Sequence, residues 1–227
     1  MNSMAQEIRV PKNCGKRYRM LGDDCDIIMD DEKYFKLSGN NVLGNRYFYS
    51  TDPSTAPPDV KFQKRAKFEE KILIWVAISS KGTSSAYVHK SKQGVRQETY
   101  LTECINNRLL PFIEKHHSDG KYLFWPDLAT SHYSNVVQQR LKDNHVPYVL
   151  PIENPPNVHQ ARPIEQVWTS FERKIYENNW EAKNIYCLAR RIKQKAKDFD
   201  QDTLRRMICS VRKKLLSMWR KGLYSVI

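Results

Sequence analysis

Residues 124–132 read Phe-Trp-Pro-Asp-Leu-Ala-Thr-Ser-His, and residues 163–168 read Pro-Ile-Glu-Gln-Val-Trp. The first stretch places Asp127 directly after an apolar run that is typical of a buried strand. The second places Glu165 near the start of a helix, because Pro163 suits the first helical position. The two acids are separated by 37 residues.

A third acidic segment lies upstream, where Asp30-Asp31-Glu32 follows Ile27-Ile28-Met29. Mg²⁺ and Mn²⁺ prefer hard oxygen ligands, and a pair of such ions can catalyse phosphodiester displacement. Glu165 also lies where a helix dipole favours the ionised carboxylate. Acids on three separate elements therefore indicate a divalent-metal site, although the chain has 25 acids and spacing alone leaves a chance grouping equally open.

The segments around these acids predict an α/β domain, in which strands and hairpins come first and helices later. A continuous apolar run predicts a buried strand over residues 71–79, with a hairpin at Lys81-Gly82. Proline and lysine predict a loop over 51–70. Apolar spacing predicts the other elements: strands at 26–37, 46–50, 85–89, 122–125 and 148–150, helices at 97–117 and 134–144, and three helices after residue 161.

Positive charge is concentrated at the C-terminal end of the chain. The formal net charge is +13, and residues 173–227 hold fifteen Lys or Arg against five Asp or Glu, a net +10. A basic face of this density attracts polyanions such as DNA, since phosphate contacts release counterions. A solvated helix surface explains the charge alone equally well.

The composition favours one large folded domain that lies inside the cell. The chain has 227 residues, 40% of them apolar, and no apolar run long enough to cross a bilayer or to form a signal peptide. Its five cysteines are scattered and never form Cys-x-x-Cys, a pattern that fits reduced thiols rather than disulfides or a structural zinc site.

Four blocks of the sequence resemble the mariner-type transposases of the Tc/mariner superfamily. They are Asp31-Glu-Lys-Tyr-Phe, Ile74-Trp-Val-Ala-Ile-Ser-Ser-Lys-Gly, Trp125-Pro-Asp-Leu-Ala-Thr-Ser-His, and residues 151–168 ending Pro-Ile-Glu-Gln-Val-Trp. The blocks occur in the family's order, and the resemblance covers essentially all of residues 20–227.

The resemblance implies a ribonuclease-H-like fold, a mixed five-stranded sheet flanked by helices, that cleaves DNA and transfers the freed strand. It implies that Asp31, Asp127 and Glu165 are the catalytic acids and hold two divalent ions, Mg²⁺ or Mn²⁺. The spacing of 37 residues between the second and third acids is longer than the commoner family value. It points to the subgroup with the longer loop, where insertion is tolerated.

Several neighbouring residues have more than one interpretation. Strand register leaves Asp30 as an alternative first ligand, although the family block favours Asp31. We expect Glu32 to face solvent or a basic neighbour, and Trp125 and Trp168 to pack rather than to stack on DNA. His132 either lies near the metals or satisfies a turn, Arg162 either contacts phosphate or lies on the surface, and His159 is expected to be incidental.

Family members carry a paired helix-turn-helix region ahead of the catalytic domain, but only about thirty residues precede Asp31. We therefore expect a catalytic domain alone, without sequence-specific recognition of transposon ends. The predicted division is a leader or residual linker over 1–24, a catalytic domain over 25–180, and a basic helical extension over 181–227 that packs on that domain.

Three functions follow as hypotheses. The first is a metal-dependent nuclease and strand transferase acting on DNA in the nucleus. The second is a catalytically silent or domesticated DNA-binding module of the same fold. The third is a ribonuclease acting on RNA–DNA hybrids. DNA would bind non-specifically through the basic C-terminal helices, and a homodimer is one candidate for the oligomeric state.

Overall fold

The structure is a computed structural model that describes residues 14–15, 19, 21–22, 24–38, 49–61, 69–89, 93–154, 161–222 and 225. A mixed sheet of five strands has the order β3-β2-β1-β5, and β4 also pairs with β2. The strands are β1 (Asp26–Lys36), β2 (Lys71–Ser79), β3 (Gly82–Thr83), β4 (Tyr87–His89) and β5 (Tyr122–Trp125).

The central strand β1 pairs antiparallel with β2 and parallel with β5. The register with β5 runs from Asp26 opposite Tyr122 to Met29 opposite Trp125. Because β5 ends opposite Met29 while β1 continues to Lys36, the chain leaving β5 emerges beside the middle of the longer β1. This register brings the segment after Trp125 next to Asp30 and Asp31.

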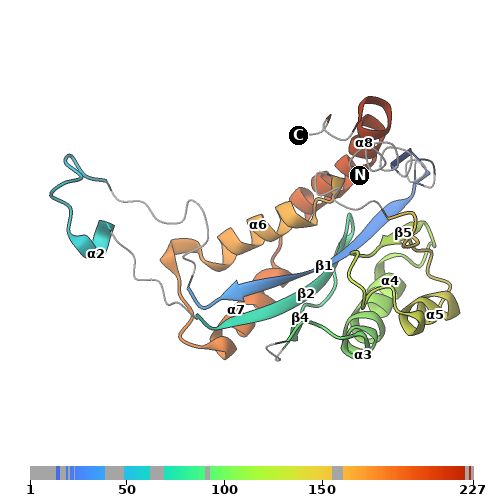
Figure 1. Cartoon of the computed structure of the whole chain (residues 1–227), viewed down its shortest axis with the longest axis horizontal. Coiled ribbons are helices and arrows are strands. Elements are labelled where there is room, and N and C mark those ends of the chain that lie inside the picture. Colours follow the sequence, from blue (N-terminus) through green and yellow to red (C-terminus); the bar gives the residue numbers. More distant parts are fainter. Residues whose placement is uncertain are drawn as a thin grey trace, which may run out of the picture.

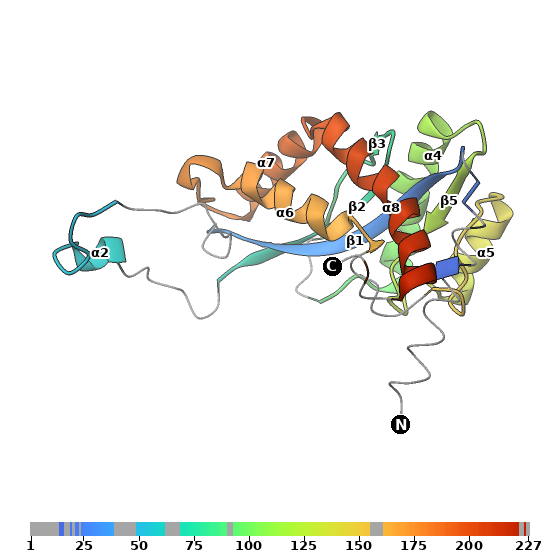
Figure 2. The same ribbon diagram turned by 90° about the horizontal axis from the view of Figure 1, so that it is seen from above.

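Both faces of the sheet are buried, so β2 is continuously apolar, as the sequence predicted. Alternation along the strands divides the core in two. Ile27, Met29 and Phe35 of β1 pack in one core with α6, α7 and α8. Ile28 packs in the other core with the segment from α3 to α5. Figures 1 and 2 show these helices around the long strands β1 and β2.

The helices follow from apolar stripes at helical spacing. The first group is α3 (Gln97–Thr99), the π-helix η1 (Tyr100–Leu109), α4 (Leu110–His116) and α5 (Asn135–Asp143). The second is α6 (Ile164–Ile175), the 3₁₀ turn η3 (Glu177–Asn179), α7 (Ile185–Lys197) and α8 (Gln201–Lys221). Asn184 and Asp200 cap α7 and α8 by accepting hydrogen bonds from backbone N–H groups.

Three details differ from the sequence-based predictions. The expected strand at 148–150 is a single bridge between Phe124 and Tyr148. The helix predicted over 97–117 is wound partly as a π-helix, directly before Pro111, which cannot donate an α-helical hydrogen bond. The predicted loop over 51–70 contains the short helix α2 (Pro58–Lys61), which lies away from the sheet in both views.

Other predictions fall on residues outside the described set. They are most of the leader 1–24, most of the strand predicted at 46–50, and His159. The five cysteines all lie among the described residues, and no disulfide joins them. Among the described residues, no helix combines the length and the apolar character that a membrane span requires.

Candidate functional site

Asp30 and Asp31 are adjacent in β1 but belong to different faces of the sheet. Asp30 is fully buried, and its carboxylate accepts hydrogen bonds from Trp75 Nε1 (3.0 Å) and the Tyr100 hydroxyl (2.5 Å). It also accepts one from the backbone N–H of Asp127 (3.1 Å). The Asp30 carboxylate is therefore occupied in supporting the chain that leaves β5.

The Asp31 carboxylate faces α6, where Trp168 Nε1 donates to one oxygen at 2.9 Å. The other oxygen accepts from the backbone N–H of Glu32 at 2.8 Å. Burial raises the pKa of Asp31 to about 6, against the opposing effects of these two donors and of Arg162. The negative charge of Asp127 is a smaller cause of the same upward shift. Asp31 is thus a carboxylate whose negative charge is incompletely compensated.

Arg162 lies between the acidic residues that the sheet brings together. Its guanidinium forms an ion pair with Asp127 Oδ1 at 3.1 Å and donates to the backbone oxygen of Asp30 at 2.9 Å. It also donates to the backbone oxygen of Pro126 at 3.4 Å. Arg162 therefore links β1 to the segment after β5, and its contact with phosphate stays a prediction.

Glu165 lies in the first turn of α6, with an exposed side chain. The helix α6 runs along β1. Its Trp168 donates a hydrogen bond to Asp31, and Glu172, one turn later, forms an ion pair with Lys33 at 3.2 Å. Three residues of helix span about 4.5 Å along the axis. Glu165 therefore lies one turn before Trp168.

The described residues contain no converging set of three or more His, Cys, Asp or Glu side chains that would by itself hold a metal ion. The donor chemistry nevertheless suits a hard divalent cation, since Asp31 and Asp127 are carboxylates coupled through space. The incompletely compensated charge of Asp31 is the kind of charge that such a cation would balance. The fold brings Asp31 and Asp127 together, and Glu165 stays on the adjacent helix turn.

A buried polar cluster supports this edge of the sheet from the face opposite α6. His132 is buried and stacks on the Tyr100 ring, with centroids 3.9 Å apart and planes at 13°. Its Nε2 lies 3.4 Å from Glu32 Oε1. Burial lowers the pKa of His132, but Asp30 and Glu32 outweigh that effect and raise it. Glu32 thus faces a basic neighbour, one of the two alternatives expected for it.

The two tryptophans pack, as the sequence predicted. Trp125 is 1% exposed and donates from Nε1 to Asn154 Oδ1 at 2.8 Å, while Trp168 is 3% exposed. Sequence reasoning missed Trp75, Tyr100 and Asn154 as supports of the site. Trp75 lay in the apolar run over 71–79 and Tyr100 in an apolar helical stripe, and both signals indicated core packing alone.

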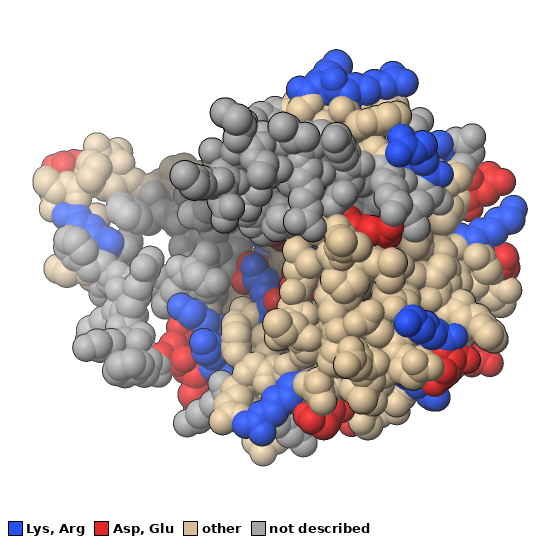
Figure 3. Space-filling model, turned by 45° about the vertical axis from the view of Figure 1, so that its right-hand side comes forward, with Lys and Arg blue, Asp and Glu red and all other residues tan. Residues whose placement is uncertain are grey.

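Positive charge is distributed unevenly over the surface. On the face shown in Figure 3, basic side chains gather at the upper edge, at the height of α8 in Figure 1. Elsewhere on that face they alternate with acidic and uncharged side chains. The exposed basic residues of α8 include Arg205, Arg206 and Lys213.

Comparison with known proteins gives matches in sequence and in fold. No protein-family model matches the chain. The chain is 23% identical to the Tc3 transposase of Caenorhabditis elegans over 194 residues, which are 86% of this chain and 55% of that protein. The chain thus spans about half the length of the curated relative it matches.

Solved structures of the Mos1 transposase have a similar fold. The Mos1 paired-end complex with the left transposon end matches with a TM-score of 0.78 at 15% identity, covering 100% of this chain and 65% of that one. The isolated catalytic domain of Mos1 mariner transposase matches with a TM-score of 0.67 at 15% identity, covering 98% and 96%. The mixed sheet flanked by helices is thus the predicted ribonuclease-H-like fold. The chain is thus similar in sequence to the Tc3 transposase and in fold to the catalytic domain of the Mos1 transposase.

Proposed function

We propose that this chain is a DDE transposase domain that cleaves DNA strands and transfers them to a target. The observation that carries the proposal is the position of Asp31 and Asp127 beside one another at the edge between β1 and β5, with Glu165 on the adjoining turn of α6. Homology to a transposase supports the same assignment. The spacing of 37 residues assigns the domain to the subgroup with the longer loop.

In this proposal Asp31, Asp127 and Glu165 are the catalytic acids and hold two divalent ions, Mg²⁺ or Mn²⁺. When bound, such ions activate the attacking oxygen and stabilise the leaving oxygen of a phosphodiester. Solved Mos1 complexes with Mn and with Mg support this choice of metal.

The chain's own residues orient the acids. Trp168 fixes one oxygen of Asp31, and the buried Asp30 carboxylate holds the backbone of Asp127. Arg162 balances part of the negative charge of Asp127. An acid held by such contacts reaches its ligand position with little loss of conformational freedom.

The proposed substrate is DNA, bound non-specifically through the basic C-terminal helices and acted on in the nucleus. Structural neighbours that are transposase complexes with transposon ends support DNA binding. We assign residues 25–180 to the catalytic domain and 181–227 to the extension, whose helices α7 and α8 share the core beneath α6. A homodimer is the proposed assembly.

Cleavage of supercoiled plasmid tests the proposal. Purified protein should nick the plasmid with Mg²⁺ or Mn²⁺ and not with EDTA, and Asp127→Ala and Glu165→Ala should each abolish nicking. Asp143→Ala, at an exposed acid of α5, is the matched control and should cut like the wild type. Absence of cutting by the wild type with either metal would rule out active catalysis.

A second candidate function is a silent DNA-binding module of the same fold. It is favoured by the absence of a converged three-acid set among the described residues. This candidate requires salt-sensitive DNA binding that Asp127→Ala and Glu165→Ala leave unchanged, together with no cleavage by the wild type. Preferential cutting of RNA–DNA hybrids would instead indicate a ribonuclease.

A further inference from the structure

A hollow lies on the side of β2 that faces away from β1, where β3 and β4 form the edge of the sheet. Its walls are α7 and the start of α8 on one side and η1 with α4 on the other, and its floor is the segment 82–86. The hollow encloses about 530 Å³. It adjoins a second one of about 810 Å³ over β4, since both are lined by Arg108 and Lys193. We refer to the two together as the edge groove.

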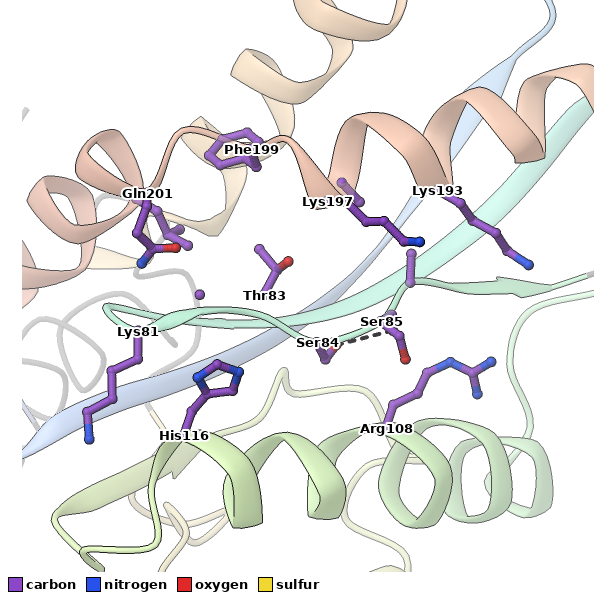
Figure 4. A pocket seen from close by; sticks show the side chains of 14 residues that line it. Lys81, Thr83, Ser84, Ser85, Arg108, His116, Lys193, Lys197, Phe199 and Gln201 are labelled. Carbon is purple, nitrogen blue, oxygen red and sulfur yellow. Dashed lines mark hydrogen bonds between the residues drawn. The ribbon is translucent and has the colours of Figure 1, made fainter.

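Basic side chains line both walls of the edge groove. Arg190, Lys193 and Lys197 come from α7, and their spacing of three and four residues places them on one face of that helix. In Figure 4 the Lys193 and Lys197 side chains extend from α7 over Ser85, and Arg108 extends from the opposite wall. The other basic residues of the lining are Lys81 and His116.

Two of these basic residues pair with acids, and Asp198, Asp200 and Asp202 alternate with the lining residues Phe199 and Gln201. Glu103 lines the groove and forms an ion pair with Arg108 at 2.8 Å. Asp119 forms one with Lys81 at 3.0 Å. Within the described part of the chain, Arg190, Lys193 and Lys197 have no ion pair.

Neighbouring groups report the same positive potential. Burial lowers the pKa of His116, and the charges of Lys115 and Lys81 lower it further. Arg108 also lies over the ring of Tyr87, 4.8 Å from its centroid, which holds the guanidinium in place across the groove. The groove therefore presents cationic side chains from both of its walls.

The spacing of the α7 cations fits a nucleic-acid backbone. Arg190 and Lys197 are seven residues apart, about 10 Å along the helix, which is the axial rise of about three nucleotides of one strand. The groove lies at the β3–β4 edge, whereas Asp31 and Asp127 lie where β1 meets β5. It is also distinct from the exposed basic residues of α8.

We propose that the edge groove is a second DNA-binding site, which holds a phosphate backbone away from the catalytic acids. The identity of the polyanion as DNA rests on the proposed function. Charge complementarity selects the backbone rather than the bases, so binding at this site is independent of sequence. A DNA segment held here extends the contact beyond the segment that is cut.

Salt-dependent binding of the full chain to a labelled 30-base-pair DNA duplex in EDTA tests the proposal. Each phosphate contact contributes about 0.9 to the slope of log K against log salt concentration. The double variant Lys193→Ala/Lys197→Ala should reduce that slope by about 2. The matched control is Lys36→Ala/Lys142→Ala, which removes the same charge from exposed positions outside the groove lining and should change the slope by less than about 0.5.

Equal slopes for the groove variant and the control would overturn the proposal, as would a reduction seen with an RNA duplex and not with DNA. Circular dichroism of both variants excludes misfolding as the cause of a change. Plasmid cleavage separates this proposal from the proposed function. Suppose that the groove variant shows the expected reduction in slope and that the wild type never cuts the plasmid. The nuclease assignment would then be wrong, and the groove assignment would stand.

Discussion

The carboxylates of Asp30 and Asp31 lie on opposite faces of the sheet, although the two residues are neighbours in β1. Asp30 meets Trp75 and Tyr100 on one side, and Asp31 meets Trp168 on the other. Alternation along a strand makes this outcome unavoidable once β1 has helices on both faces. Two acids of the same type therefore have different roles.

Asp30→Asn is expected to destabilise the protein. The amide replaces one carboxylate oxygen by a donor, which then faces either the donors of Trp75 and Tyr100 or the backbone N–H of Asp127. The loss should be about 2–4 kcal/mol of unfolding free energy. Urea unfolding measures it, and Asp143→Asn, at an exposed acid of α5, should change it by less than about 0.5 kcal/mol.

Asp31→Asn is expected to have the opposite effect on stability at neutral pH. The folded-state pKa of Asp31 is raised to about 6, above its usual 3.8, so the folded state binds the proton more tightly than the unfolded state. The stabilisation that this proton binding gives the folded state is complete below pH 3.8 and is lost as the pH rises to about 6. The free energy of unfolding falls by about 3 kcal/mol over that window. Metal-free wild type should therefore lose stability over that window relative to Asp31→Asn. Parallel stability curves for the two proteins would contradict the assignment.

Added Mg²⁺ should raise the melting temperature of the wild type more at pH 7.5 than at pH 5. The ion competes with the proton for the buried Asp31 carboxylate, and the proton is bound only at the lower pH. Differential scanning fluorimetry measures the shift. The Asp31→Asn protein should show a much smaller shift, and an equal shift in both proteins would exclude Asp31 as a ligand.

Arg162→Gln should tighten Mg²⁺ binding about fivefold, about 1 kcal/mol, because it removes a competing cation from Asp127 Oδ1. The same change should lower the stability of the metal-free protein, since the link to the backbone oxygen of Asp30 is lost. Calorimetric titration gives the affinity. Arg140→Gln, on the surface of α5, serves as the control and should leave Mg²⁺ affinity unchanged.

His132 and His116 should titrate on opposite sides of the usual histidine pKa. Asp30 and Glu32 raise the pKa of His132 against burial, while burial, Lys115 and Lys81 lower that of His116. His132 therefore adds stability below about pH 6.5, and this is lost as the pH rises through its folded pKa. NMR titration of the imidazole protons, assigned with His132→Gln and His116→Gln, measures both values. A His132 pKa below that of His116 would contradict the cluster geometry.

Much of the architecture was accessible from the chain alone. The apolar run of β2, the strand before Asp127, and the stripes of α6 and α8 follow from hydrophobic periodicity, which depends on local spacing. The strand predicted at 148–150 was wrong, since its apolar residues form only the bridge to Phe124. Periodicity reports burial and does not report which backbone groups find a partner.

The sequence by itself determined which acids are candidates, because Asp127 and Glu165 stand near recognisable element ends and all three acids, Asp31 included, lie in recognisable blocks. The tertiary structure decided what surrounds them. Arg162 meets Asp127 across 35 residues, and Tyr100 meets Asp30 across 70. Such contacts, and the raised pKa of Asp31, depend on strand pairing and burial. The edge groove likewise exists only because folding places α7 opposite η1 and α4. These elements are far apart in the sequence, and the spacing of their basic residues does not indicate that they line one surface.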